Sequence, residues 1–260
     1  MNAQEVGVEL YTFRDQIPKD VEGMHKKISE MGIRVVEGGG TYGLTKEAYK
    51  QLLEKNNLKM PSYAADFGAL EKDPQAIAND AKYFGAKYVV CFWVPHNGTT
   101  FTIEDAKKSA DVFNKAGRIL KENGLTFLYH AHGYEFQKYG DGTFFDYMLK
   151  NYDPKYVNFQ MDVFWFKNSG QDPVEYLNKY PKRFQSLHLK DRKIGTENNV
   201  TAEADVETNV TLGTGDVDIA GIMKAAKKIG IKYAFIEDES SRSMEQVPES
   251  LTYLKQLKND

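Results

Sequence analysis

Short apolar runs alternate with longer amphipathic stretches along almost the whole chain. The short runs have the length of strands, and the longer stretches repeat apolar residues at helical spacing. The pattern predicts eight strands: Val6–Phe13, Val35–Gly39, Met60–Ala65, Tyr88–Trp93, Phe127–Phe136, Val157–Val163, Phe184–Lys190 and Tyr233–Glu237. It predicts a helix after each of them: Asp20–Met31, Thr45–Asn56, Pro74–Phe84, Thr102–Asn123, Thr143–Asn151, Pro173–Tyr180, Val217–Ile229 and Met244–Leu257.

This recurrence indicates the fold class. Eight strand-then-helix units in 260 residues predict an α/β protein, a (β/α)8 TIM barrel formed as one domain over residues 1–260. The rival is an open doubly wound sheet, which usually has a glycine-rich turn after its first strand. Here that turn is Thr12-Phe13-Arg14-Asp15-Gln16, without glycine. The polar segment Lys193–Gly215 is interpreted as an insertion after the seventh strand: a lid, a subunit contact or a long loop.

Composition excludes several classes of protein. A formal net charge of −3 argues against a general binder of nucleic acid or membrane surfaces. The single cysteine, Cys91, excludes an internal disulfide framework and a cysteine-rich metal site. The sequence contains no apolar stretch of membrane-spanning length and, as given, no signal peptide. We therefore expect a cytoplasmic protein, or a periplasmic or secreted one if a leader was removed.

The strand ends carry the candidate chemistry, because the active site of such a barrel lies at the carboxyl ends of its strands. In the fifth strand, period-two alternation predicts His130 and His132 on one face, and Glu135 follows just past the strand end. The other strand-end candidates are Asp162 on the sixth strand, His188 on the seventh, Glu237 on the eighth, Glu37 on the second and Glu9 on the first.

The last four strands deliver three carboxylates and an imidazole to one rim, from Glu135, Asp162, His188 and Glu237. Like charges this close are costly unless a positive charge compensates them, and a divalent cation is the simplest answer. An oxygen-rich ligand set favours Mn²⁺ or Mg²⁺, with Zn²⁺ or Co²⁺ as alternatives. The alternative to one divalent metal ion is a salt-bridge network in which Lys190, Arg14 or Arg192 supplies the positive charge.

Several motifs together resemble a known superfamily. They are Gly7-Val8-Glu9-Leu10-Tyr11-Thr12-Phe13-Arg14-Asp15, Val36-Glu37, Tyr129-His130-Ala131-His132-Gly133-Tyr134-Glu135-Phe136, Met161-Asp162, Leu187-His188-Leu189-Lys190-Asp191, Leu212-Gly213-Thr214-Gly215-Asp216-Val217-Asp218 and Phe235-Ile236-Glu237-Asp238. The chain resembles the xylose isomerase-like barrels, the sugar phosphate isomerase/epimerase group that includes AP endonucleases. The resemblance implies a single divalent metal on Glu135, Asp162, His188 and Glu237. One departure is His130, where many epimerases of the group have the first metal-binding glutamate.

The resemblance implies a metal-dependent sugar isomerase or epimerase, which abstracts a proton next to a carbonyl through a metal-stabilised enediolate. The alternative is a metal-dependent lyase or dehydratase acting on a keto-sugar, a cyclitol or a 3-keto-glycoside, and the histidines favour it. An AP-type endonuclease is disfavoured, because it needs more than the five histidines present and a basic groove. A non-catalytic sugar-binding protein would bind no metal.

Roles follow for individual residues as hypotheses. His132 or His130 is one acid/base and Glu237 or Glu37 the other, while Lys190 neutralises developing oxyanion charge. The predicted substrate site contains Glu9, Phe13, Trp93, Trp165 and Arg14, with the aromatic rings stacking on the sugar. The expected partner is a small-molecule carbohydrate, without nucleic acid or membrane, and a homodimer is expected because barrels of this group often pair.

Overall fold

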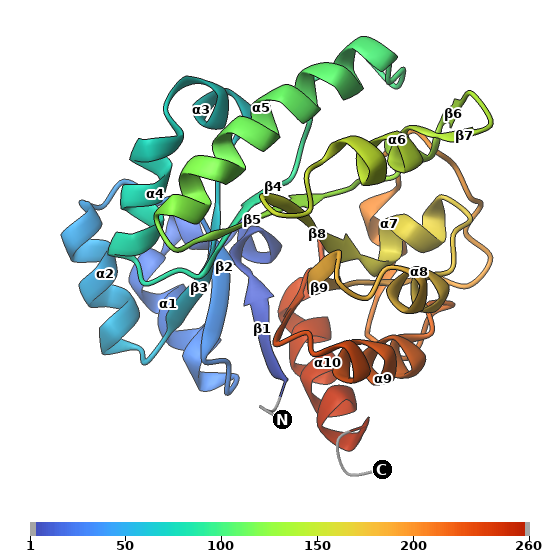
Figure 1. Cartoon of the computed structure of the whole chain (residues 1–260). Coiled ribbons are helices and arrows are strands. Elements are labelled where there is room, and N and C mark those ends of the chain that lie inside the picture. Colours follow the sequence, from blue (N-terminus) through green and yellow to red (C-terminus); the bar gives the residue numbers. More distant parts are fainter. Residues whose placement is uncertain (1–3, 258–260) are drawn as a thin grey trace.

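The computed structural model describes residues 4–257, and it confirms the predicted closed barrel (Figure 1). Eight parallel strands pair in the order β1-β12-β9-β8-β5-β4-β3-β2. Their bounds are β1 Glu5–Glu9, β2 Val35–Gly38, β3 Lys59–Ala64, β4 Tyr88–Cys91, β5 Thr126–His130, β8 Val157–Asp162, β9 Phe184–Leu189 and β12 Tyr233–Ile236. All eight predicted strands are therefore present, with shifted ends.

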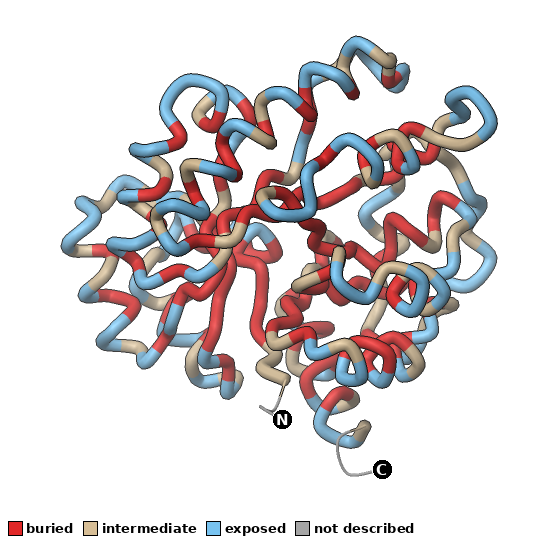
Figure 2. The backbone as a smooth tube through the Cα atoms, in the orientation of Figure 1, coloured by how far each residue is buried: buried red, intermediate tan, exposed pale blue. Residues whose placement is uncertain are grey.

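Helices surround the barrel and cover its outer face. They are α1 Val21–Glu30, α2 Lys46–Lys55, α3 Phe67–Lys72, α4 Pro74–Tyr83, α5 Ile103–Glu122, α6 Phe144–Asn151, α7 Val163–Asn168, α8 Pro173–Lys179, α9 Ile219–Ile229 and α10 Ser243–Leu257. Figure 2 shows buried strands and helices that are buried on the inner side and exposed on the outer side. Between residues 4 and 257, none of the helices is long and apolar enough to cross a membrane.

Side-chain caps explain where many of the helices begin. Thr102 and Asp105 form a reciprocal capping box at the start of α5, and Thr143 and Asp146 form one at the start of α6. Each such cap stabilises a helix by about 1 kcal/mol, because it satisfies amide groups that have no partner within the helix. The caps therefore fix the points at which the chain enters the helices that follow β4 and β5.

Short elements fill the connections at the carboxyl end of the barrel. They are the 3-10 helices η1 Leu10–Phe13, η2 Ile17–Lys19, η3 Tyr134–Phe136 and η4 Val206–Thr208, and the paired strands β6 Lys138–Tyr139 with β7 Gly142–Thr143 and β10 Asp191–Arg192 with β11 Asn209–Val210. The predicted first strand ends early, at Glu9, because the Glu9 carboxylate accepts a hydrogen bond from the Tyr11 amide and starts η1.

The polar segment after β9 is held at both ends. The Asp191 carboxylate accepts backbone hydrogen bonds from Gly213, Gly215 and Val217, over 2.8–3.1 Å. The buried Arg192 guanidinium binds both carboxylate oxygens of Asp216, at 3.0 and 2.8 Å. The predicted insertion is thus anchored directly beside the end of β9.

Candidate active site and metal centre

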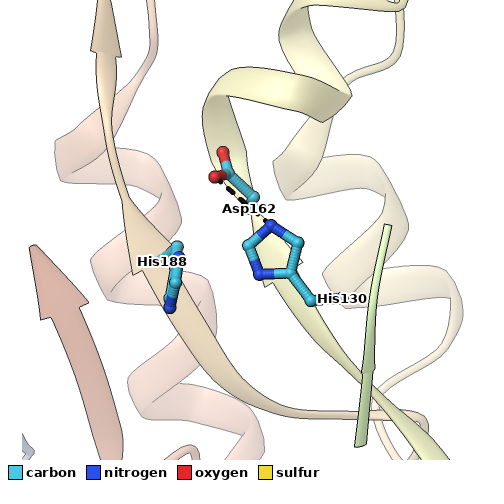
Figure 3. Close-up of side chains that lie close together, drawn as sticks. All are labelled: His130, Asp162 and His188. Carbon is cyan, nitrogen blue, oxygen red and sulfur yellow. Dashed lines mark ion pairs between the residues drawn. The ribbon is translucent and has the colours of Figure 1, made fainter. Parts of the chain in front are cut away.

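Three side chains from neighbouring strands meet at the carboxyl end of the barrel (Figure 3). They are His130 at the end of β5, Asp162 at the end of β8 and His188 on β9, and one ligand atom from each lies within 4.8 Å of the others. His130 Nε2 is 3.6 Å from Asp162 Oδ2. Both atoms are buried and have no hydrogen-bond partner. A buried polar atom without a partner costs about 1–3 kcal/mol, so the arrangement fits a cation between these groups.

The start of α7 fixes the orientation of the Asp162 carboxylate. Asp162 Oδ1 accepts hydrogen bonds from the amides of Phe164 at 2.8 Å and Trp165 at 3.1 Å, which caps the helix. Oδ2 is consequently held toward His130. Burial raises the pKa of Asp162 to about 7, as expected for a carboxylate withdrawn from water without a full complement of donors.

Glu237 lies against this cluster just after β12. Its Oε2 is 3.3 Å from His188 Nδ1 and 3.3 Å from Lys190 Nζ. Burial would raise the pKa of Glu237, but Lys190 and His188 outweigh burial and hold it well below its ordinary value. Lys190 also forms an ion pair with Glu239. Glu237 is therefore an anion placed to complete the donor set.

Glu135 does not join the cluster, so the structure does not bring the four predicted metal ligands together. Its buried carboxylate accepts hydrogen bonds from the Tyr129 hydroxyl and from the amides of His132 and Gly133, the last at 2.8 Å. Tyr129 packs against Phe113 of α5, outside the barrel. The chain leaves β5 at His130 and turns at Gly133, whose φ is +104°, so Glu135 faces the helix layer. His130 occupies the place that was predicted for Glu135.

A second polar layer lies next to the cluster. Glu37 is fully buried at the end of β2, and its carboxylate accepts hydrogen bonds from Ser62, from Gln160 at 2.8 Å and from His188 Nε2. Glu9 joins the layer with one buried oxygen that has no partner. Burial and the neighbouring Glu37 raise the pKa of Glu9 well above its ordinary value. All of these Glu37 contacts are to other protein groups, which does not favour the predicted proton exchange with substrate.

His132 lies between two tryptophans just after β5. The centroid of its ring is 4.6 Å from that of His130, 5.4 Å from that of Trp93 and 5.7 Å from that of Trp165. Its Nδ1 is buried without a partner. Burial lowers the pKa of His132 to about 4, so the ring is uncharged at neutral pH and can accept a proton.

A cavity of about 280 Å³ opens beside the cluster. It is lined by Asp66, Phe67, Gly68, Phe92, Trp93 and Pro95. Phe92 lines the cavity and also contacts the cluster, with its ring centroid 5.1 Å from that of His130. Trp93 is 41% exposed, as an aromatic ring that receives a ligand must be.

The other predicted substrate residues are placed differently. Phe13 is fully buried in the hydrophobic core, so the structure does not bring it to the site, and the expected stacking on a sugar is not favoured. The Arg14 guanidinium stacks on Tyr11 and donates to the Glu239 carbonyl oxygen at 2.9 Å. Trp165 is buried and holds its ring near the Lys190 ammonium group, 5.5 Å from it.

Sequence reasoning missed Gln160, Ser186 and Phe92. Gln160 and Ser186 each precede a cluster residue by two positions, Asp162 and His188, and so share its face of the strand. A polar side chain at an inward position of an apolar strand was the signal that could have found both. Phe92 carried no comparable signal, since a phenylalanine after a strand is usually part of the core.

Comparisons with known proteins agree with this architecture. Residues 25–257 match the xylose isomerase-like TIM barrel family. An inosose dehydratase 2 of Bacillus cereus is 30% identical over 189 residues, which are 63% of this chain and 62% of the relative. The chain thus spans about three fifths of the length of the curated relatives it matches.

Two solved structures extend the comparison. A sugar phosphate isomerase/epimerase from Parabacteroides distasonis superposes with a TM-score of 0.81 at 27% identity, over 97% of this chain and 98% of the other. The IOLI protein with a binding zinc atom superposes with a TM-score of 0.73 at 14% identity, over 98% and 96%, and shows the shared fold. The chain belongs to the xylose isomerase-like TIM barrel family.

Proposed function

We propose that this protein is a metal-dependent lyase that removes a proton next to a carbonyl group of a carbohydrate or cyclitol and expels an oxygen substituent from the adjacent carbon. The observation that carries the proposal is the cluster of His130, Asp162 and His188, with Glu237 against it and unpartnered atoms facing one point. The likeness to inosose dehydratases supports the same class of reaction.

The donor set fits a divalent cation. His130 Nε2, Asp162 Oδ2, His188 Nδ1 and a Glu237 oxygen would hold it. Two imidazoles shift the preference from Mg²⁺ toward Zn²⁺, Mn²⁺ or Co²⁺, because imidazole is a softer ligand than carboxylate or water. When bound, the cation would act as a Lewis acid that draws negative charge onto a substrate carbonyl oxygen.

His132 is proposed as the group that moves the proton. Its uncharged ring takes the proton from the carbon next to the carbonyl, and a carbon–carbon double bond forms as the adjacent carbon–oxygen bond breaks. Because burial gives the protonated ring a pKa of about 4, it readily returns the proton to the departing oxygen, which leaves as water or an alcohol. One base acting on one face predicts a syn elimination.

Lys190 is proposed to stabilise the negative charge that develops during the reaction. Burial would lower the pKa of Lys190, but Glu237 and Glu239 outweigh burial and raise it, so the ammonium group stays charged. A permanent cation is suited to electrostatic stabilisation rather than proton transfer. The cavity beside Phe92 and Trp93 would receive the part of the substrate away from the carbonyl.

An isomerase or epimerase is the second candidate, favoured by the nearly full-length likeness to the Parabacteroides distasonis protein. Epimerisation needs a second acid/base on the opposite face of the substrate. Glu237 could serve, since it lies at the cluster and its side chain is 11% exposed. Glu237 is paired with Lys190 and is already assigned to the cation, so it is poorly placed to exchange a proton with substrate as well, which favours the lyase.

The test is incubation of the metal-loaded protein in D₂O with inosose, 3-keto-glucosides and free ketoses, followed by NMR. The lyase proposal predicts an unsaturated ketone and a released water or alcohol. Deuterium uptake with isomerised sugar and no elimination would instead support the second candidate, and neither reaction with any substrate would refute both. His132→Gln should lower kcat by about 10²–10⁴-fold with unchanged metal content.

A further inference from the structure

We propose that Glu37, on the distant strand β2, sets the tautomers of both imidazoles that face the cation site, and so acts as a positioning residue for the metal centre. The inference rests on the proposed function, because it concerns the same centre. It assigns to Glu37 a role different from the acid/base role expected from its strand-end position.

The first link is the direct contact between Glu37 and His188. Glu37 Oε1 lies against His188 Nε2 at hydrogen-bond distance, and both side chains are fully buried. A carboxylate has no hydrogen to donate, so His188 Nε2 must carry one. The nitrogen that remains to bind a cation is then Nδ1, which is the one that faces Glu237, 3.3 Å away.

The second link runs through Gln160. Its Nε2 group donates to Glu37 Oε2 at 2.8 Å and to Ser186 Oγ at 3.0 Å. This orientation turns Oε1 of the same amide toward His130 Nδ1, also at 2.8 Å. An amide oxygen only accepts, so His130 Nδ1 carries the hydrogen, and its Nε2 keeps a lone pair that faces Asp162 Oδ2.

The Glu37 carboxylate disfavours the flipped orientation of the Gln160 side-chain amide. If the Gln160 amide were flipped, its oxygen would face Glu37, and two acceptors would oppose each other in a buried site. The amide nitrogen would then face His130 Nδ1 and would move the ring hydrogen to Nε2, where it blocks a cation. Unsatisfied buried acceptors are costly, so Glu37 strongly disfavours this state.

The surroundings of Glu37 suit this positioning role. It is fully buried, and a third donor, the Ser62 hydroxyl, also binds Oε2. Carboxylates that bind the second nitrogen of a metal-ligating histidine fix its tautomer and orientation, and their loss typically weakens metal binding by about 10–100-fold. Here one carboxylate would serve two imidazoles, one directly and one through an amide.

The experiment uses the whole 260-residue chain labelled with ¹⁵N at histidine. In the metal-free state, long-range ¹H–¹⁵N NMR spectra should show hydrogen on Nδ1 of the neutral His130 ring. Glu37→Gln replaces an acceptor oxygen by an amide NH₂ group, which donates and therefore opposes the three donors Ser62, Gln160 and His188. We expect mixed His130 tautomers in the spectra of this variant. Calorimetry should show that it binds Zn²⁺ or Mn²⁺ about 10–100-fold more weakly. Gln160→Leu, which leaves Glu37 and His188 in contact, should free the His130 tautomer alone.

Ser62→Ala is the matched control. It removes one hydrogen bond from the same carboxylate without removing its charge, so the His130 tautomer should stay and the affinity should change by less than about threefold. Unchanged tautomer and affinity in both Glu37→Gln and Gln160→Leu would overturn the inference. A wild-type protein that binds neither Zn²⁺ nor Mn²⁺ would instead overturn the metal centre of the proposed function.

Discussion

Asp162→Asn should make the metal-free protein more stable and at the same time abolish most of its stabilisation by metal. The substitution keeps Oδ1, which caps α7 through the amides of Phe164 and Trp165. It replaces Oδ2, which lies 3.6 Å from His130 Nε2 without a hydrogen-bond partner, by an uncharged NH₂ group. The variant therefore removes a buried charge and a cation ligand while it preserves the helix cap.

The magnitude follows from the pKa of Asp162. Burial raises it from 3.8 to about 7, so at pH 8 the folded metal-free protein holds a charge that costs at most about 4 kcal/mol. This cost decreases as the pH falls through 7 and is absent below about 3.8, where the group is protonated in both states. At pH 8 the variant should gain up to about 4 kcal/mol, or about 8–16 °C in Tm.

Bound metal should stabilise the wild-type protein more than the Asp162→Asn variant, which is opposite to the difference between the metal-free proteins. At a free concentration of about 1,000 Kd, a cation stabilises the wild-type protein by about 4 kcal/mol, and a hundredfold weaker Kd removes about 2.7 kcal/mol of this. The assay is thermal unfolding at pH 8 with chelator and with Mn²⁺ or Zn²⁺. The control is Asp172→Asn, since Asp172 caps α8 with the same two bonds, at 2.8 and 3.1 Å, on the surface. The reasoning would be refuted if metal-free Asp162→Asn melted at a lower temperature than the metal-free wild type. It would also be refuted if metal raised the Tm of Asp162→Asn and of the wild type equally.

Three further predictions concern the cavity, the metal and the core. Trp93→Ala should raise KM about tenfold with little change in kcat. The control is Tyr83→Ala, which removes a similarly exposed aromatic ring at the end of α4 and should change neither constant. Equal effects of the two substitutions would exclude a substrate role for the cavity. Metal binding should release about one proton at pH 8.5, from His188, because Glu37 and Glu237 outweigh its burial and hold the pKa of His188 well above the ordinary value. At pH 6 it should release about two protons, because Asp162 is then protonated as well. Calorimetry in buffers of different ionisation enthalpy measures this, and a buffer-independent enthalpy would contradict it. Burial lowers the pKa of His25, so its contribution to the free energy of unfolding is complete above about pH 6.5 and is lost as the pH falls. Urea unfolding between pH 7 and 5 should therefore show a smaller loss of stability for His25→Phe than for the wild type. An identical loss would exclude His25 as the cause.

The strand ends predicted much of the site because a parallel barrel brings all carboxyl ends to one rim. His130, Asp162 and His188 end or nearly end their strands, and period-two alternation sets the direction of their side chains. That rule applies only while the chain remains in the strand. β5 ends at His130, so the direction of Glu135 depends on the turn at Gly133 and on the Tyr129 hydroxyl, which no local pattern reveals.

The polar layer shows a second limit of sequence reasoning. Glu37 stands at a strand end like the cluster residues, but its contacts with Ser62 and Gln160 come from β3 and β8, far away in sequence. Which polar side chains meet inside a barrel depends on the register between strands, and the register between β2 and β3 shifts within the pairing. Strand-end residues could thus be predicted, but their partners could not.

The most direct test of the account is anomalous scattering from crystals of the protein grown with Mn²⁺ or Zn²⁺. The account predicts one strong peak at the carboxyl end of the barrel, about 2.0–2.3 Å from His130 Nε2, Asp162 Oδ2, His188 Nδ1 and an oxygen of Glu237, with Glu135 still bound to Tyr129. A peak coordinated by Glu135, or no peak among these side chains at saturating metal, would contradict it.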